Sequence, residues 1–274
     1  MIVPDQIRKC VVFIGYQLAD GQMRLAGSGF FLARRQHGDN VRDVFLVTAK
    51  HVIDGIHKLG LTEIFIRANT TTGQSVWTKC QSTDWLFHPT DSTVDLALIR
   101  TGVPGDWDHL IIPPSMFATT QTLEANAVGL GDEVFIVGLF RHHHGTQKNI
   151  PIVRVGNLAA MAEEKVHTKD FGPVDAYLIE ARSIGGLSGS PVFLNMGPVR
   201  YLDNQVKHAQ GGLMFFLLGL IHGHFDVPSS TIDGTNSDAA DPLSAERVNT
   251  GIAIVVPIDK ILEAINAHSK QEAS

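Results

Sequence analysis

Cysteine is nearly absent from this chain, which has only Cys10 and Cys80 among its 274 residues. So few cysteines cannot form a disulfide framework. We expect two free thiols rather than one bridge, which fits a reducing compartment, and hence a cytoplasmic protein. A secretory leader is not evident either, because the apolar part of the N-terminus covers only residues 10–14 and no small-residue cleavage site follows it.

Long apolar runs and an excess of basic charge are also missing. The longest apolar run, Leu213 to Ile221, has about half the length that a bilayer requires and is typical of a buried strand. The net charge of −6 gives no reason to expect nucleic acid or a membrane surface as a partner. With 44% hydrophobic and 18% charged residues, the composition predicts a globular protein with a sizeable core.

Helical periodicity is rare, and short runs rich in Val, Ile and Phe predict strands throughout the chain. In the first half these runs cover residues 10–17, 27–35, 43–49, 63–70, 75–81 and 94–101. In the second half they cover residues 132–140, 150–158, 175–181, 190–194, 215–221 and 251–257. The pattern predicts an all-β sandwich or barrel architecture.

Two segments are predicted to be helical. Near the C-terminus, apolar residues recur at helical spacing and Asp259 is placed to cap the helix; these residues are Ile258, Ile261, Leu262 and Ile265. A shorter helical turn is expected after His51, through Val52 and Ile56.

Two irregular regions suggest how the chain is divided. The strand-poor segment after Gly102 contains several prolines and predicts a connection at 105–127 between an N-terminal domain, 1–104, and a C-terminal domain, 128–274. Residues 226–249 are polar and rich in turn residues, so we expect a surface loop there.

The stretch 183–193 is the densest turn signal, with three glycines and three serines before a short apolar run. Glycines on both sides of Ser188 permit a sharp turn and the close approach of a substrate. Such a turn can aim the backbone N–H groups of Gly186 and Ser188 at one point, as an oxyanion requires. Taken alone, the stretch is equally well explained as a tight hairpin.

A serine nucleophile needs a general base, and the base needs an orienting carboxylate. His51 follows an apolar strand, and Asp95 stands at the head of another, where an unpaired carboxylate would be costly. Taken singly, the histidine is more simply explained as structural and the aspartate as a turn residue or cap.

Together, these motifs resemble those of the chymotrypsin-like (trypsin-fold) serine peptidases. Residues 48–51 (TAKH) resemble the family's Thr-Ala-Ala-His, and residues 94–99 (VDLALI) resemble its Asp-Ile/Leu-Ala-Leu. Residues 186–191 (GLSGSP) resemble its Gly-Asp-Ser-Gly-Gly-Pro, and the order of the motifs also matches. Residues 249–262 (NTGIAIVVPIDKIL) resemble the closing strand and C-terminal helix of HtrA-type bacterial members.

The resemblance implies two antiparallel six-stranded β-barrels with the active site between them, followed by a C-terminal helix. It implies a serine endopeptidase that acts on polypeptides and needs no cofactor. Ser188 would attack the peptide carbonyl, His51 would act as base and then acid, and Asp95 would hold the imidazole. The N–H groups of Gly186 and Ser188 would bind the oxyanion. Any regulatory or targeting module is expected to be a separate partner chain.

One departure from the family bears on activation. Zymogen-type members carry Asp before the nucleophilic serine, where it pairs with a newly cleaved N-terminus, but Leu187 occupies this position here. Activation by that ion pair is therefore excluded, and we expect a site that is preformed or ordered by other means.

Substrate preference is harder to predict. By motif spacing, Arg182 and Ser183 lie near the floor of the primary pocket, while His222 and His224 come from the strand that lines the cleft. A polar, partly basic pocket would favour an acidic or amide side chain. An internal ion pair of Arg182 and structural roles for the histidines explain the same residues.

Other kinds of site fit less well. Ser188 excludes a cysteine nucleophile, and an α/β-hydrolase elbow would need glycine where Ser190 stands. Three consecutive histidines, 142–144, cannot all face one ion in an extended chain, so we expect no metal site. A peptidase-fold protein that binds without cutting is the remaining alternative. The presence of all three triad residues favours the enzyme, because binding alone does not require them.

Overall fold

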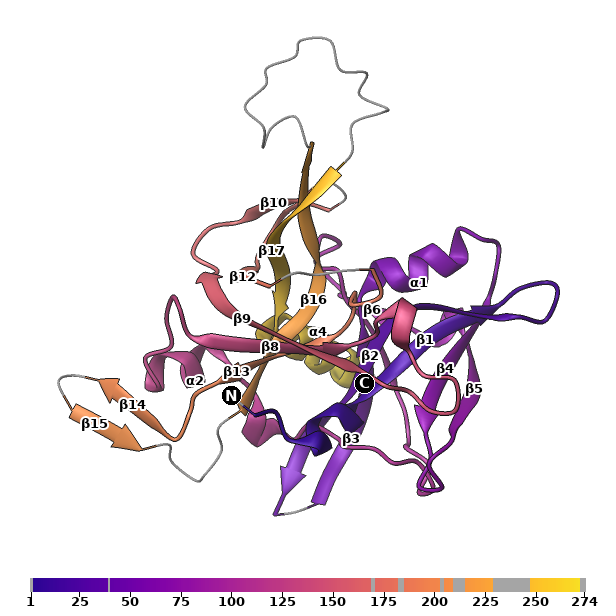
Figure 1. The fold of residues 1–274 in the computed structure, drawn as a ribbon, viewed down its shortest axis with the longest axis horizontal. Coiled ribbons are helices and arrows are strands. Elements are labelled where there is room, and N and C mark those ends of the chain that lie inside the picture. Colours follow the sequence, from indigo (N-terminus) through magenta and orange to yellow (C-terminus); the bar gives the residue numbers. More distant parts are fainter. Residues whose placement is uncertain are drawn as a thin grey trace, which may run out of the picture.

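The computed structural model describes residues 2–38, 40–168, 171–181, 185–202, 205–208, 215–228 and 247–271. The fold is mostly β, with an open seven-stranded sheet from the first half of the chain, a closed six-stranded barrel from the second half and a C-terminal helix (Figure 1). Each of the twelve segments predicted as strands contains a strand. Five short strands were not predicted, at residues 86–87, 166–168, 172–174, 199–202 and 205–208.

The seven-stranded sheet has the order β5-β4-β1-β2-β3-β7-β6, and its neighbouring strands are antiparallel. Its strands are β1 (Val11–Gln17), β2 (Met23–His37), β3 (Asn40–Thr48), β4 (Glu63–Asn69), β5 (Ser75–Gln81), β6 (Leu86–Phe87) and β7 (Ala97–Arg100). Helix α1 (Lys50–His57) follows β3, as predicted, and buries Val52, Ile53 and Ile56.

The prediction that this half forms a closed barrel was wrong. Within the described residues, β5 and β6 are the two edges of an open sheet and do not pair with each other. The 3-10 turn η2 (Ser82–Asp84) separates them, fixed by the Gln81 N–H group, which donates to Asp84 Oδ2 at 2.8 Å. Strand β6 has only two residues, and both pair with β7.

The predicted barrel of the second half is confirmed as a closed barrel with the order β12-β17-β16-β13-β8-β9. Its strands are β8 (Glu133–Gly138), β9 (Ile152–Ala160), β12 (Tyr177–Glu180), β13 (Pro191–Asn195), β16 (Phe215–Pro228) and β17 (Arg247–Pro257). Two small hairpins accompany it, β10 (Val166–Thr168) with β11 (Gly172–Val174), and β14 (Val199–Leu202) with β15 (Gln205–His208).

The segment 226–249 is not a loop at either end. Strands β16 and β17 continue to pair there, with Asp226 opposite Asn249 and Pro228 opposite Arg247, so they form an arm that extends beyond the barrel (Figure 1). Residues 229–246 lie outside the described residues.

The segment 105–127 contains no strand and carries the 3-10 turn η3 (Pro114–Met116) and helix α2 (Thr120–Ala125). Two further 3-10 turns, η1 (Asp5–Cys10) and η4 (Arg141–His143), precede β1 and follow β8.

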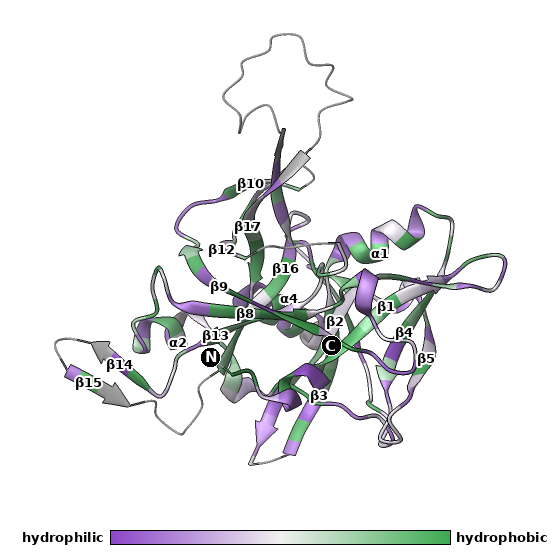
Figure 2. Cartoon of the chain, viewed as in Figure 1, coloured by the Kyte–Doolittle hydropathy of each residue, from purple (hydrophilic) through white to green (hydrophobic). Residues whose placement is uncertain are grey.

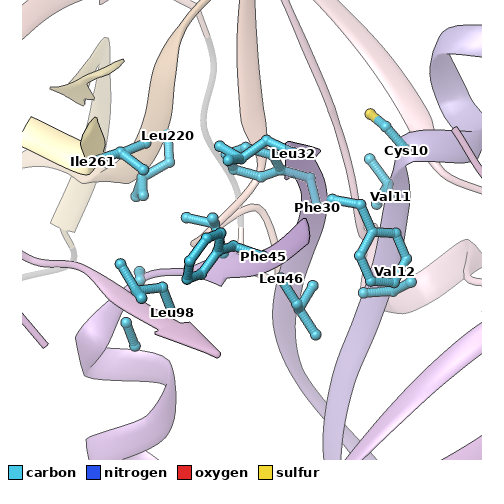
Figure 3. Close-up of a cluster of buried hydrophobic side chains, with 14 of the residues drawn as sticks. Cys10, Val11, Val12, Phe30, Leu32, Phe45, Leu46, Leu98, Leu220 and Ile261 are labelled. Carbon is cyan, nitrogen blue, oxygen red and sulfur yellow. The ribbon is translucent and has the colours of Figure 1, made fainter. Parts of the chain in front are cut away.

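The largest hydrophobic cluster is shared by the two halves of the chain. It joins Leu32 and Phe45 of the sheet with Leu220 of β16 and Ile261 of the C-terminal helix, all of them buried (Figure 3). Hydrophobic residues gather along the strands in the middle of the molecule (Figure 2). Because apolar burial is the main stabilising force, the sheet and the barrel each depend on the other for part of their core.

The C-terminal helix α4 (Ile258–Gln271) connects the end of the chain to the first half. His268 Nε2 lies 2.8 Å from the carbonyl oxygen of Phe87, and Arg34 Nε donates to Asn266 Oδ1 at 3.1 Å. Asp259, predicted as the cap, instead lies inside the first turn, where its carboxylate accepts hydrogen bonds from the N–H and hydroxyl of Thr120.

Both cysteines are free, as predicted. Burial raises the pKa of the Cys10 thiol well above its ordinary value. Among the described residues, no helix combines the length and the apolar character needed to cross a bilayer.

Truncating Ile261 to Ala should destabilise both halves together. The side chain is fully buried in the shared cluster, and such a truncation costs about 2–5 kcal/mol, against about 0.5–1.5 kcal/mol for Ile261→Val. All three tryptophans lie in the first half, at residues 77, 85 and 107, so their fluorescence reports on the sheet. In urea unfolding, the fluorescence and circular dichroism midpoints should fall equally. An unchanged fluorescence midpoint would contradict the shared core.

Candidate active site

A buried carboxylate lies at the centre of the site. Asp95 stands two residues before β7 and is 1% exposed. Its Oδ1 accepts the backbone N–H of His51 at 2.8 Å, and its Oδ2 lies 2.7 Å from His51 Nδ1 and 2.6 Å from His222 Nδ1. An ionised carboxylate can only accept hydrogen bonds, so both rings carry a proton on Nδ1.

These donors decide the charge of Asp95. Burial by itself would raise the pKa of the carboxyl, but the hydrogen bonds from His222 and His51 and the attraction of both rings outweigh burial. The pKa of Asp95 is therefore held well below its ordinary value. The site contains a permanent negative charge at neutral pH.

Helix α1 positions His51. The histidine is the second residue of the helix, next to the end of β3, and three apolar residues of α1 are buried below it. Its backbone and its ring bind the two oxygens of one carboxylate, which fixes both the helix and the imidazole. The side chain is 36% exposed, so the ring is accessible from the solvent side.

A buried serine on β2 holds the loop that carries Ser188. The N–H of Ser28 donates to the carbonyl oxygen of Ser188 at 2.9 Å, and the Ser28 hydroxyl donates to the carbonyl oxygen of Gly186 at 3.0 Å. The same hydroxyl accepts the N–H of Leu139 at 2.9 Å. Ser28 is fully buried, so these bonds are shielded from water. The sequence motifs did not predict this role of Ser28, although it lies inside the Gly-Ser-Gly segment 27–29.

Gly189 could not be replaced by a residue with a side chain without moving the loop. Its φ is +80°, in the left-handed region, and a Cβ atom there would lie 2.3 Å from both the Ser28 carbonyl oxygen and the Thr48 hydroxyl. Gly186 also has a positive φ, +105°. Gly189 therefore allows a close approach between this loop and strands β2 and β3, and Gly186 allows a close approach to Leu139.

The structure distinguishes the two serines of the loop. Ser190 is fully buried, and none of the described residues offers its hydroxyl a hydrogen-bond partner. Ser188 is partly exposed and lines a cleft of about 1100 Å³ that His51 also lines. Leu187 is fully buried in the apolar core of the barrel, so an apolar residue at this position has a structural reason.

Of the four residues predicted for the substrate pocket, the structure describes only the two histidines. His222 and His224 both line the cleft, and His224 Nε2 lies 3.2 Å from Asp226 Oδ1. The His222 ring binds Asp95, a contact that the sequence did not predict. Arg182 and Ser183 lie outside the described residues.

One cluster among the described residues brings metal-ligand atoms close together, namely His51, Asp95 and His222, with these atoms within 4.8 Å of one another. A tetrahedral zinc ion with bonds of about 2.0–2.1 Å needs about 3.3 Å between its ligand atoms. Both nitrogens lie closer than this to Asp95 Oδ2, at hydrogen-bond distances, so hydrogen bonding accounts for the cluster. Residues 141–143 form the exposed turn η4.

A family model described as the trypsin-like peptidase domain matches residues 27–199. The chain therefore belongs to the trypsin-like peptidase family. The matched segment includes His51, Asp95 and the Ser188 loop, whereas His222 follows it. A search of curated proteins finds no match.

Similar solved structures include the crystal structure of Deg5, with 16% identity over 94% of this chain and 87% of that chain and a TM-score of 0.50. Another is the inactive form of a serine-to-alanine mutant of Rv3671c from M. tuberculosis H37Rv, with 15% identity over 95% of this chain and 87% of that chain and a TM-score of 0.46. The likeness to Deg5 supports a chymotrypsin-like fold and no more than the fold.

Replacing Gly189 by Ala should destabilise the protein strongly. The left-handed backbone costs about 1–2 kcal/mol for alanine, and the overlap with backbone atoms adds to this cost. We expect a loss of more than about 2 kcal/mol in urea unfolding. Gly185→Ala, in the same loop, is the matched control, because a Cβ atom there meets nothing within 4 Å. Equal stability of the two variants would contradict the packing described for Gly189.

The stability that Asp95 contributes should depend on pH. The folded pKa of this carboxyl lies below its unfolded value of about 3.9, so the contribution is complete above that pH and falls on acidification, by about 1.4 kcal/mol per pH unit. Urea unfolding between pH 5 and pH 3 should therefore show a steeper loss in the wild type than in Asp95→Asn. Parallel pH dependence in the two proteins would contradict the depressed pKa.

Proposed function

We propose that this protein is a serine endopeptidase that hydrolyses peptide bonds through an acyl-enzyme, with Ser188 as nucleophile, His51 as general base and Asp95 as the orienting carboxylate. The observation that carries the proposal is the pairing of His51 Nδ1 with the buried, ionised Asp95 in a cleft that Ser188 also lines. Membership of the trypsin-like peptidase family supports the same reaction.

The tautomer of His51 suits a general base. With the Nδ1 proton held by Asp95, the neutral ring has its lone pair on Nε2. In the first step, Nε2 takes the Ser188 hydroxyl proton while the serine oxygen bonds to the peptide carbon and the carbonyl oxygen becomes an oxyanion. The imidazolium then gives the proton to the leaving amine as the C–N bond breaks. In the second half of the reaction, water attacks the acyl-enzyme with His51 again as base, and the carboxylic acid product leaves as Ser188 regains its proton.

The loop geometry supports the proposed oxyanion site. The carbonyl of Leu187 accepts the N–H of Ser190 at 2.9 Å. Because C=O and N–H point in opposite directions across a trans peptide, the N–H of Ser188 is directed away from Ser190. We propose that this group and the N–H of Gly186 bind the oxyanion.

Order in this loop does not depend on a cleaved N-terminus. Buried Leu187 anchors one side, and the Ser28 hydrogen bonds anchor the other. These contacts support a site that is preformed in the part of the loop that the structure describes, which is the expectation drawn from Leu187.

The substrate is proposed to be an extended polypeptide. The cleft has a volume of about 1100 Å³ and a largely polar lining, with both charge signs present among the lining residues Lys50, Asp54, Lys58, His224 and Asp226. A role of Arg182 and Ser183 in substrate preference, a cytoplasmic location, and a separate regulatory chain all stay predictions, as does the absence of nucleic-acid and membrane partners.

An active-site phosphonate probe tests the nucleophile. Wild-type protein should be labelled on Ser188, and Ser188→Ala should not be labelled. Ser190→Ala is the matched control and should be labelled like the wild type, because its hydroxyl is buried and has no partner among the described residues. Ser188→Ala should also lose peptide hydrolysis by about 10⁴- to 10⁶-fold.

Other results would overturn this assignment. Equal labelling of wild type and Ser188→Ala would exclude Ser188 as nucleophile and favour a protein that binds without cutting. Labelling that is lost in Ser190→Ala, in a protein shown by circular dichroism to be folded, would move the role to Ser190.

A further inference from the structure

The carboxylate of Asp95 has a second imidazole partner that the proposed mechanism does not use. His222 lies on β16 of the barrel, whereas Asp95 precedes β7 of the sheet, and 127 residues separate them in sequence. The His222 side chain is 11% exposed, and its Nδ1 lies 2.6 Å from Asp95 Oδ2. This hydrogen bond therefore joins the two halves of the protein at the proposed catalytic carboxylate.

Aromatic neighbours fix the His222 ring. The His51 ring lies edge-on at a centroid distance of 5.9 Å and an angle of 80°. Phe171 also lies edge-on, at 5.0 Å and 79°. With Asp95 accepting its Nδ1 proton, the ring has a defined position and a defined tautomer.

One carboxylate oxygen therefore receives ring N–H groups from two histidines. The second donor restrains the carboxylate, because rotation of Asp95 toward or away from His51 would break the bond to His222. It also spreads the negative charge of Asp95 over two rings, so that the carboxylate stabilises the imidazolium form of His51 less than it would alone.

We propose that His222 is a positioning residue of this site, which keeps the Asp95 carboxylate oriented toward the His51 ring. By sharing the charge of Asp95, it also weakens the attraction that keeps a second proton on His51. The proposal rests on the proposed function, since it assigns His51 as the general base. It concerns the chemistry of catalysis rather than substrate contact, although His222 also borders the cleft.

Other charged groups near His222 bear on any pH dependence. Apart from Asp95 and His51, Asp175 lines a small cavity with His222 on the side of β11. Six further titratable side chains line the cleft that His222 borders. They are His167 of β10, His224 and Asp226 of β16, and Lys50, Asp54 and Lys58 on the side of α1. Among the described residues, the His222 ring is hydrogen-bonded to Asp95 and lies edge-on to His51 and Phe171. The variants below leave all these groups in place.

The kinetic test compares two substitutions of His222. Phe keeps a flat ring without the donor, and Asn keeps a side-chain N–H close to the position of Nδ1. His222→Phe should lower kcat/KM by about 10- to 100-fold, mainly through kcat, because a hydrogen bond to a charged group is lost. The acid limb of the pH profile of kcat/KM should move to higher pH in this variant, because Asp95 then stabilises the protonated form of His51 more strongly. His222→Asn should bring kcat/KM and the position of the acid limb back towards the wild-type values.

Nuclear magnetic resonance tests the hydrogen bond without relying on activity. In Ser188→Ala protein with ¹⁵N-labelled histidine, two low-field Nδ1 protons should appear, one from each ring bound to Asp95. Changing His222 to Asn or Phe in this background should remove one signal and keep the other. Circular dichroism of each variant checks that it is folded.

The outcomes separate this inference from the proposed function. A single low-field imidazole signal in Ser188→Ala, or a wild-type pH profile in a folded His222→Phe, would overturn the role of His222. A loss in His222→Phe that appears only in KM would assign His222 to substrate contact and overturn it as well. The remaining outcome is two low-field signals in Ser188→Ala together with a wild type that neither hydrolyses peptides nor reacts with the phosphonate. This outcome would support the pairing of His222 with Asp95 and overturn the peptidase function instead.

Discussion

The structure depends on keeping one negative charge away from water. Asp95 is buried, and its ionised carboxylate is stable there only because donors from α1 and β16 converge on it. The helix belongs to the first half of the chain and the strand to the second, so the charge is satisfied only when both halves are folded against each other. The shared hydrophobic cluster supplies the apolar contact that brings them together. Burial of the Asp95 charge and formation of the site therefore both require the same contact between the two halves.

A second constraint acts on the loop that carries Ser188. Ser28 binds two carbonyl groups of this loop, and Gly189 lets the loop approach β2 and β3 more closely than any side chain would allow. The serine that is partly exposed is the one whose carbonyl is held by Ser28. The sheet therefore serves as a rigid support for a loop that belongs to the barrel.

Local patterns in the sequence predicted twelve of the strands, helices α1 and α4 and the motifs around His51, Asp95 and Ser188, because each depends on neighbours within a few residues. Closure of the first half was mispredicted, since the motif resemblance could not show that β6 would be only two residues long. The roles of Ser28 and the contact of His222 with Asp95 were missed, because the hydrogen bonds of the Ser28 hydroxyl span 111 and 158 residues and that of His222 spans 127. No local periodicity indicates a contact of that range.

The position of α4 has a consequence for synthesis of the protein. The last helix supplies Ile261 to the cluster that also contains residues of β2 and β3, and His268 binds the backbone beside β6. A nascent chain whose α4 segment is still inside the ribosome has every proposed catalytic residue but lacks part of the core that supports them. Folding of the site therefore waits until α4 has emerged.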